Sequence, residues 1–418
     1  MSRTARGFMP RIVSIALALS AFPAAAQSLS LEEAWRIAEQ ANPALQAARS
    51  GRLAASGQLA ESDSPLWNNP TLRLEPYRRT VPQPGGPDQR YREWAVDLSQ
   101  TFEIAGQQNL RRLAARQESA SLEDMLEETR RQLRAEVEER FVRVLSLQTR
   151  VNLERENLDL VQRAAMAMGK RVAAGETRRL EGNLAAVEAE RTRNQLGQLG
   201  ENLIAARAEL AQLLQLSPER LLEAEGDVTR TTTYGRAALL EAAAGRPQLA
   251  ALERREQAAR HRLELERAAV YPDITLGVNA ANEGPSDLRE RVVGFSVSIP
   301  LPVFRRNQAG IGKAAAELSQ VQIERHAATR DTRAAVLSQW SRVEQLRARV
   351  ARLRSAVLPP LEENLRLSQS GLREGEIGLT ELLLVNRQVL EGRRDTLEAE
   401  TELRLAQIAL ERAAGWTQ

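Results

Sequence analysis

Residues with the chemistry of a catalytic or metal site are few in this 418-residue chain, and they stand apart. His261 and His326 are the only histidines, and neither has a second ligand three or four residues away. Without cysteine, neither a disulfide nor a thiolate metal site can form. The sequence also shows no Ser-His-Asp set, phosphate-binding glycine loop or paired-carboxylate pocket. We therefore predict that the protein is not an enzyme, with no catalytic residues, metal or cofactor.

Two glycine turns are the most regular polar feature, "RVAAGE" and, 200 residues later, "GLREGE". A carboxylate follows each glycine after six residues, Glu181 after Gly175 and Glu381 after Gly375. Glycine suits a tight turn between helices because it adopts positive φ without strain, so each turn also fits an ordinary helix C-cap. The common spacing raises the question of whether the surrounding sequence repeats as well.

The composition indicates long helices rather than one compact globule, because aromatic residues make up only 4% and mean hydropathy is -0.40. The pI near 9.6 points towards nucleic acid, but the charge distribution does not. The first 26 residues hold three arginines and no acid, so the remainder carries 58 less 3, or 55, basic residues against 55 acidic ones. We therefore predict no nucleic-acid partner, and the Arg–Glu runs are typical of solvated helix faces.

Residues 1–26 have the three parts of a cleaved secretory signal peptide. The basic start "MSRTARGFMPR" precedes the apolar run "IVSIALALSAF", and small residues at 24–26 predict cleavage after Ala26. The alternative is that the segment stays attached as a membrane anchor. No other stretch reaches the ~18 apolar residues of a spanning helix. The protein is thus expected to be exported, with no lipidated cysteine at its new start.

The rest of the chain predicts one order of elements twice, in residues 27–224 and 236–418, joined by a linker at 225–235. Each half has a helix with proline in its first turn, Pro43 or Pro247, where the missing N–H is tolerated. Two alternating runs, a long helix, a glycine turn and a return helix follow in each half. We therefore predict a two-fold internal repeat.

The alternating runs predict four β-strands with one apolar face. The first run of each half places Leu72 and Leu74, or Ile274, Leu276 and Val278, on that face. The second runs contribute Trp94, Val96, Leu98 and Phe102, and then Val293, Phe295, Val297 and Ile299. Gly294, Ser296 and Ser298 fall on the other face of the last run.

The proline-free run 104–170 and the matching run 307–373 each predict a helix roughly 100 Å long. Return helices are predicted at 178–216 and 378–414. Pro359 and Pro360 interrupt the second long run, and a proline inside a helix removes a hydrogen bond. The second hairpin should therefore bend where the first runs straighter.

Four strands cannot close a membrane barrel, because such barrels begin at about eight strands and open edges are not tolerated in hydrocarbon. Three copies would supply twelve strands, and would also cover the apolar stripes of the long helices. The alternative is a sheet that stays in water, as in a periplasmic coiled-coil adaptor without a pore.

The whole chain after cleavage resembles the TolC-type outer-membrane factors, the exit ducts of tripartite efflux pumps. The resemblance rests on the repeat, the two glycine turns and "SIPLPVFRRNQAGI" after the fourth strand. The segment "PLPVFRRNQ" is most similar to the heavy-metal CzcC-like branch, which serves cobalt, zinc, cadmium or nickel pumps. The resemblance implies a mainly α homotrimer, with a twelve-stranded outer-membrane β-barrel and an α-barrel reaching into the periplasm. A multidrug or type I protein-secretion duct is the alternative within the family.

The resemblance also implies partners and site residues. A periplasmic adaptor (membrane-fusion) protein would dock at the tip, and an inner-membrane transporter of the resistance-nodulation-division type would supply the energy. The matching tip positions are Arg171, Ala174, Gly175, Glu176, Glu374, Gly375, Glu376 and Ile377. Ile377 stands where the family has a basic gate residue, which removes one partner of the inherited salt bridge.

Glu181 and Glu381 match acidic positions near the family's pore constriction. Three copies of each would make a ring that favours cations, although most glutamates on such helices are merely solvated. The apolar strand residues Trp94, Val96, Leu98, Val293, Phe295, Val297 and Ile299 would face outer-membrane lipid. Tyr91 and Trp94 fit an interfacial aromatic girdle, and Trp67 fits either that girdle or packing at a helix end.

Overall fold

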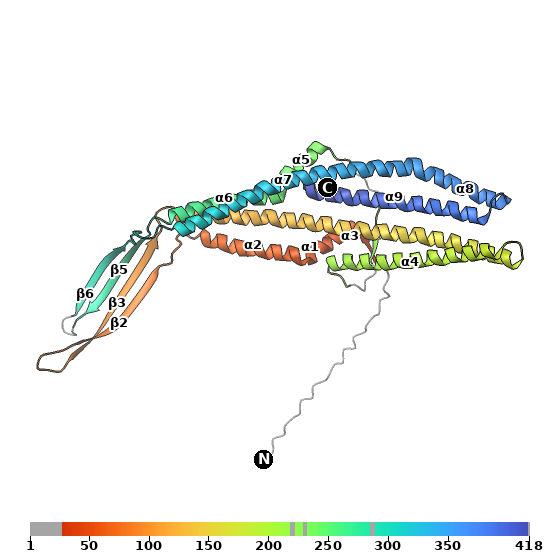
Figure 1. Cartoon of the computed structure of the whole chain (residues 1–418). Coiled ribbons are helices and arrows are strands. Elements are labelled where there is room, and N and C mark those ends of the chain that lie inside the picture. Colours follow the sequence, from red (N-terminus) through yellow and green to blue (C-terminus); the bar gives the residue numbers. More distant parts are fainter. Residues whose placement is uncertain (1–26, 218–221, 229–231, 285–288, 417–418) are drawn as a thin grey trace, which may run out of the picture.

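The computed structural model describes residues 27–217, 222–228, 232–284 and 289–416, and the signal peptide predicted at residues 1–26 lies outside them. The described chain is elongated, with a sheet at one end and long helices running away from it (Figure 1). Within these ranges, no helix carries an apolar run long enough to cross a bilayer.

The first half of the chain contains the predicted series of a helix, two strands and a long helical hairpin. Its elements are α1 (Leu31–Ala41), α2 (Pro43–Ser62), β2 (Thr71–Val81), β3 (Gln89–Phe102), α3 (Gln107–Ala173) and α4 (Arg179–Leu213). The short helix α1 was not anticipated from the sequence.

The second half repeats this order with one interruption in its long helix. Its elements are α5 (Arg236–Ala244), α6 (Pro247–Ala268), β5 (Ile274–Glu283), β6 (Glu290–Ser298), α7 (Gln308–Arg352), the π-helical turn η1 (Leu353–Val357), α8 (Leu358–Glu374) and α9 (Leu379–Ala414). The mainly α class with four strands in one larger sheet is confirmed.

The predicted proline-led helices begin where the local sequence requires. Pro43 and Pro247 occupy the first helical positions of α2 and α6. The Asn42 side chain accepts a hydrogen bond from the Ala44 backbone N–H at 2.9 Å, which satisfies one of the free donors of the first turn. Proline then sets the helical φ at no cost in hydrogen bonding.

The four strands of both halves form one antiparallel sheet in the order β2-β3-β5-β6. β3 of the first half pairs with β5 of the second, so the two halves meet in the middle of the sheet. β2 and β6 are therefore its edges, each with one row of backbone groups facing outward.

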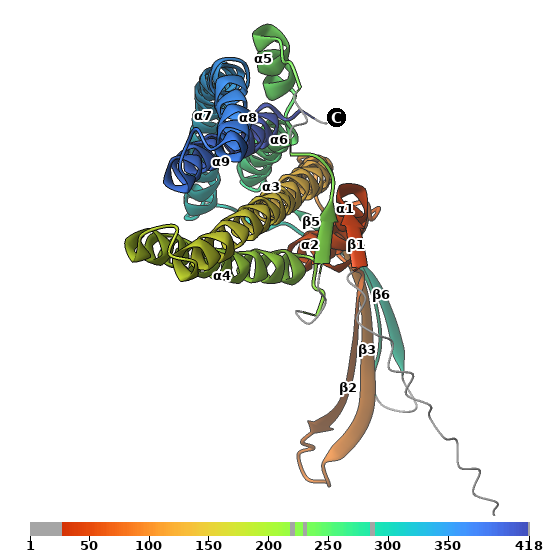
Figure 2. The same cartoon turned by 90° about the vertical axis from the view of Figure 1, so that its right-hand side faces the viewer.

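A second, two-stranded sheet was missed by the sequence analysis. β1 (Gln27–Ser30) pairs in parallel with β4 (Leu222–Glu225), and the two strands lie side by side next to α1 (Figure 2). Residues 229–231 of the linker predicted at 225–235 lie outside the described residues, but Tyr234 within it is only 8% exposed. This linker is therefore partly built into the helical body.

α3 is the central helix of the molecule. It packs against α2, α4, α6 and α9, and so touches both halves. Its predicted apolar stripe is buried, with Val137 and Val144 at 0% exposure and Phe141 at 3%. Burying this stripe against several helices stabilises a 67-residue helix that propensity alone would not hold.

The bend predicted at Pro359 and Pro360 takes the form of a π turn. α7 ends at Arg352, the five residues of η1 follow, and the Leu358 N–H bonds the Leu353 carbonyl. The wider turn precedes the two prolines, which then occupy the first turn of α8. Figure 1 shows the resulting arch of α7 and α8, whereas α3 continues without interruption.

Candidate functional site

One face of the four-stranded sheet is apolar across every strand. In the observed register Leu98 lies opposite Leu72 and Val278, and Val278 lies opposite Phe295. Cross-strand partners point to the same side of a sheet. The apolar face comprises Leu72, Leu74, Trp94, Val96, Leu98, Leu276, Val278, Val293, Phe295 and Val297. Phe295 is 68% exposed, so this face is not covered by the chain itself.

The opposite face is polar and closely filled. Ser99, Gly277 and Ser296 form one row across β3, β5 and β6, and Gly294 lies opposite Asn279 in the next. A Cβ added at Gly277 would lie 2.5 Å from Ser296 Oγ, and one at Gly294 would lie 2.5 Å from Asn279 Oδ1. A larger residue at either position would require the Ser296 or Asn279 side chain to move, because these polar side chains occupy the space above the two glycines.

One predicted strand residue lies elsewhere. β6 ends at Ser298, so Ile299 falls in the loop after the strand and pairs with no partner in the sheet. Pro300 follows it, and a residue before proline is held extended while the proline itself has no N–H for a ladder. Ile299 is thus corrected from a strand position to a loop position.

The first predicted tip is a Schellman turn. The Glu176 N–H bonds the Arg171 carbonyl at 2.9 Å, and the Gly175 N–H bonds the Val172 carbonyl at 3.1 Å. Gly175 has φ +75°, and an added Cβ would meet nothing within 4 Å. Arg171 and Glu176 form an exposed ion pair at 3.6 Å, and Ala174 is the first residue beyond α3.

The second tip has the same hydrogen-bond pattern. The Glu376 N–H bonds the Gly371 carbonyl at 2.8 Å, and Gly375 has φ +79° with open space around it. Ile377 packs over Gly371, its Cγ atoms 3.5 Å from the position of an added Cβ. Glu374 is the last residue of α8. Both tips lie at the end of the molecule away from the sheet (Figure 1).

Glu181 and Glu381 occupy equivalent places, the third residue of α4 and of α9. A carboxylate there is stabilised by the helix dipole. Glu181 also accepts a hydrogen bond from the Thr177 hydroxyl, whereas Glu381 is exposed. Their shared spacing from the glycines therefore has a local structural reason, whatever further role the two carboxylates have.

The aromatic candidates separate into two environments. Trp67 lies under the Arg111 guanidinium, 3.9 Å from Cζ to the ring centroid, where α3 begins. Trp94 is 45% exposed on the apolar face of the sheet. Tyr91 pairs with Arg79 in the sheet, on the polar side. Of the two places open to Trp67, the structure shows the contact with a helix end.

A buried ion-pair network between α3 and α9 was not found from the sequence. Arg404, 6% exposed, donates to Glu138 and lies 3.7 Å from Glu411. Tyr234 donates to Glu411, and burial together with that hydrogen bond raises the pKa of the tyrosine. Arg404 and Glu138 are 266 residues apart in the chain, so no local pattern signals the pair.

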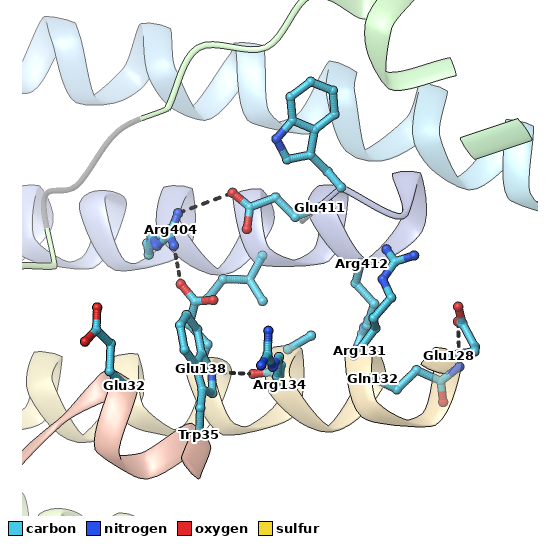
Figure 3. Close-up of a pocket in the computed structure, with 13 residues that line it drawn as sticks. Glu32, Trp35, Glu128, Arg131, Gln132, Arg134, Glu138, Arg404, Glu411 and Arg412 are labelled. Carbon is cyan, nitrogen blue, oxygen red and sulfur yellow. Dashed lines mark hydrogen bonds and ion pairs between the residues drawn. The ribbon is translucent and has the colours of Figure 1, made fainter. Parts of the chain in front are cut away.

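The network borders a cavity of about 310 Å³ between α1, α3 and α9 (Figure 3). Trp35 lies on its α1 side and donates from Nε1 to the Arg134 carbonyl at 3.1 Å. At the far end of the cavity burial favours the neutral form of Glu128, but hydrogen bonds from Arg246 and Gln132 outweigh it and hold the pKa of Glu128 below its usual value.

Further polar contacts join α3 to α9 towards the tips. Ser146 and Thr401 share a hydrogen bond at 2.7 Å, Arg394 pairs with the fully buried Glu154, and Asn386 donates to Asn157 at 2.8 Å. These pairs fix the register of one hairpin against the other. Together with the Arg404–Glu138 pair, they connect the two helical hairpins through polar side chains.

The two histidines lie on different helices, His261 on α6 and His326 on α7. Among the residues that the structure describes, no three His, Cys, Asp or Glu side chains are grouped so as to hold a metal ion.

Comparison with known proteins gives the same architecture. The cobalt-zinc-cadmium resistance protein CzcC of Cupriavidus metallidurans is 27% identical over 372 residues, which cover 88% of this chain and 86% of CzcC. CusC has a similar structure, with TM-score 0.75 and 20% identity over 92% of this chain and 91% of its own. VceC, an outer membrane protein of Vibrio cholerae, has TM-score 0.75 and 18% identity over 92% and 96% of the two chains.

The sequence profile described as "Outer membrane efflux protein" matches residues 35–215 and 238–416, which are nearly all of the described chain. The two matched segments correspond to the two halves that the element order defines. The chain therefore belongs to the outer membrane efflux protein family.

Proposed function

We propose that this protein is the passive exit duct of a tripartite efflux pump of the resistance-nodulation-division type. The observation that carries the proposal is the sheet, with an apolar face and a polar face in one unbroken register. A strand of a membrane barrel has this arrangement because its outward side chains meet lipid and its inward side chains meet water. The chain does no chemistry itself, and an inner-membrane transporter supplies the energy.

The working unit is a homotrimer in the outer membrane, exported by the cleaved signal peptide at residues 1–26. β2 and β6 are unpaired edges, and four strands are too few to close. Three copies joined at those edges make twelve strands, and the long helices continue as a barrel in the periplasm. The halves that each copy contributes are residues 27–224 and 236–418.

The two Schellman turns are the docking points for a periplasmic adaptor protein. They are exposed at the end of the hairpins, and Gly175 and Gly375 have open space on the side where a Cβ would point. The docking surface comprises Arg171, Ala174, Gly175, Glu176, Glu374, Gly375, Glu376 and Ile377. Glu181 and Glu381, close behind the turns, form acidic rings at the narrow end of the trimer.

The exported substrates are heavy-metal cations. The relationship to a cobalt-zinc-cadmium resistance protein supports this substrate class, as do the two predicted acidic rings. A wide water-filled duct needs only to admit the hydrated cation, so no dedicated metal site is required in the wall.

The experiment is to delete the gene from its source strain and measure growth in rising cobalt, zinc and cadmium concentrations. The deletion should lower tolerance, and the wild-type gene supplied in trans should restore it. If the deletion lowered tolerance to drugs but not to metals, the proposed metal substrate would be wrong. If the protein were recovered in the soluble periplasmic fraction, the proposed outer-membrane duct would be wrong.

A further inference from the structure

Among the described residues, the two most exposed large hydrophobic side chains, Phe304 and Leu301, lie in the loop between β6 and α7, residues 299–307. Phe304 is 94% exposed, Leu301 77% and Val303 63%. The loop is not loose, because the Val303 N–H bonds the Leu301 carbonyl and Asn307 donates to the Glu266 carbonyl at 2.9 Å. Pro300 and Pro302 stiffen it further. A fixed loop thus holds a phenyl ring almost entirely outside the protein.

Two exposed arginines follow the ring directly, Arg305 and Arg306. In the part of the chain that the structure describes, neither forms an ion pair. The corresponding loop of the first half, residues 103–106, has no arginine. Its charged residue is Glu103, which forms an ion pair with Arg111 at 2.7 Å. Only the loop of the second half combines protruding apolar side chains with uncompensated cations.

We propose that the 299–307 loop is a lipid anchor, in which Phe304 enters the edge of the bilayer and Arg305 and Arg306 bind phospholipid phosphates. The loop continues directly from β6, whose Phe295 and Val297 lie on the apolar face. Apolar side chains beside cations are the pattern of a segment that lies in a membrane interface. The inference rests on the proposed outer-membrane position of the sheet.

A second copy of the chain fits this loop less well. A protein interface over Phe304 would also bury the neighbouring arginines, and charged side chains are depleted at interface cores because their desolvation is costly. When a phenyl ring lies in the membrane interface, the phosphates of the lipid headgroups are at the level of the neighbouring arginines and can pair with them.

The absence of native cysteine allows a direct test. The full chain carrying Phe304→Cys, labelled with a nitroxide, is reconstituted in phosphatidylcholine–phosphatidylglycerol vesicles. Collision of the label with oxygen, which partitions into lipid, is compared with collision with a water-soluble nickel chelate. Phe295→Cys serves as the bilayer reference, and Asp159→Cys, at an exposed charged position of α3, as the aqueous one.

The Phe304 label should favour oxygen over the chelate, at a ratio between those of the two references. A ratio equal to that at Asp159, or shielding from both reagents as in a subunit contact, would overturn the anchor. Adding Arg305→Gln and Arg306→Gln should shift the ratio at Phe304 towards the aqueous value, and an unchanged ratio would overturn the phosphate contacts. A water-exposed Phe295 label would instead show that the proposed barrel is wrong.

Discussion

Arg404 forms a buried ion pair that joins the second half of the chain to the first. It donates to Glu138 on α3 and approaches Glu411 on its own helix. Replacing Arg404 by Met should destabilise the protein by ~3–5 kcal/mol, because a buried carboxylate is left without its cation. Thermal unfolding followed by circular dichroism measures the loss.

The control is the double variant Glu138→Leu with Arg404→Met, which removes both charges and should recover much of the stability. Recovery is expected because a buried pair replaced by apolar side chains is often neutral. A single variant as stable as the wild type would show that the pair contributes nothing.

Glu128 predicts a pH dependence. Its folded pKa is depressed, since hydrogen bonds from Arg246 and Gln132 outweigh the effect of burial. Its contribution is therefore fully present above the unfolded pKa of about 4.3, and is lost as pH falls through the lower folded value. Wild type and Glu128→Gln should differ in unfolding free energy at pH 7, and the difference should shrink below pH 4. A difference in unfolding free energy that grew below pH 4 would contradict a depressed pKa for Glu128.

At the scale of elements, the sheet predicts opposite responses at adjacent residues of β6. Arg at Phe295 should cost ~2–4 kcal/mol if the apolar face meets the bilayer, whereas Arg at Ser296, on the polar face, should be tolerated. Urea unfolding from vesicles gives both values. Equal losses at the two positions would mean that the two faces of the sheet are not lipid and water.

The tips predict a loss of function without a loss of fold. Trp at Gly175 or Gly375 strains a positive-φ turn by about 1–2 kcal/mol, but its Cβ has open space within 4 Å. Metal tolerance should fall while trimer yield in the same membranes stays normal. Asn at the same position is the control, because it accepts this backbone conformation and is small. Normal tolerance with the Trp variants would leave the turns as plain helix caps.

The strands and hairpins could be predicted from sequence because each rests on a local signal. Alternation defined the apolar face around Phe295, and glycine defined both turns. The π turn could be expected only as a bend, since its form depends on packing around Pro359. The β1–β4 sheet and the Arg404 network join residues far apart in the chain, and short or charged segments leave no period that reveals such partners.

At the scale of the whole molecule, the trimer should be the unit of stability. One copy leaves the edges β2 and β6 unpaired, and it also leaves Leu180, Leu184 and Ile204 exposed along α4. Mass measurement in mild detergent should give three chains, and the unfolding temperature should rise with protein concentration. A folded monomer of unchanged stability would contradict the shared barrel.

The spacing of the α3–α9 contacts has a mechanical consequence. Among the hydrogen bonds and ion pairs that the described residues form between the two hairpins, the one between Asn157 and Asn386 lies nearest the tips. Gly175 lies 18 residues beyond Asn157, about 27 Å of helix at 1.5 Å per residue. The end of the first hairpin is thus a cantilever, and a tilt of about 5° at its support carries that end through about 2 Å. In the described chain, a pair of asparagines far from the tip is therefore the last polar restraint on its sideways movement.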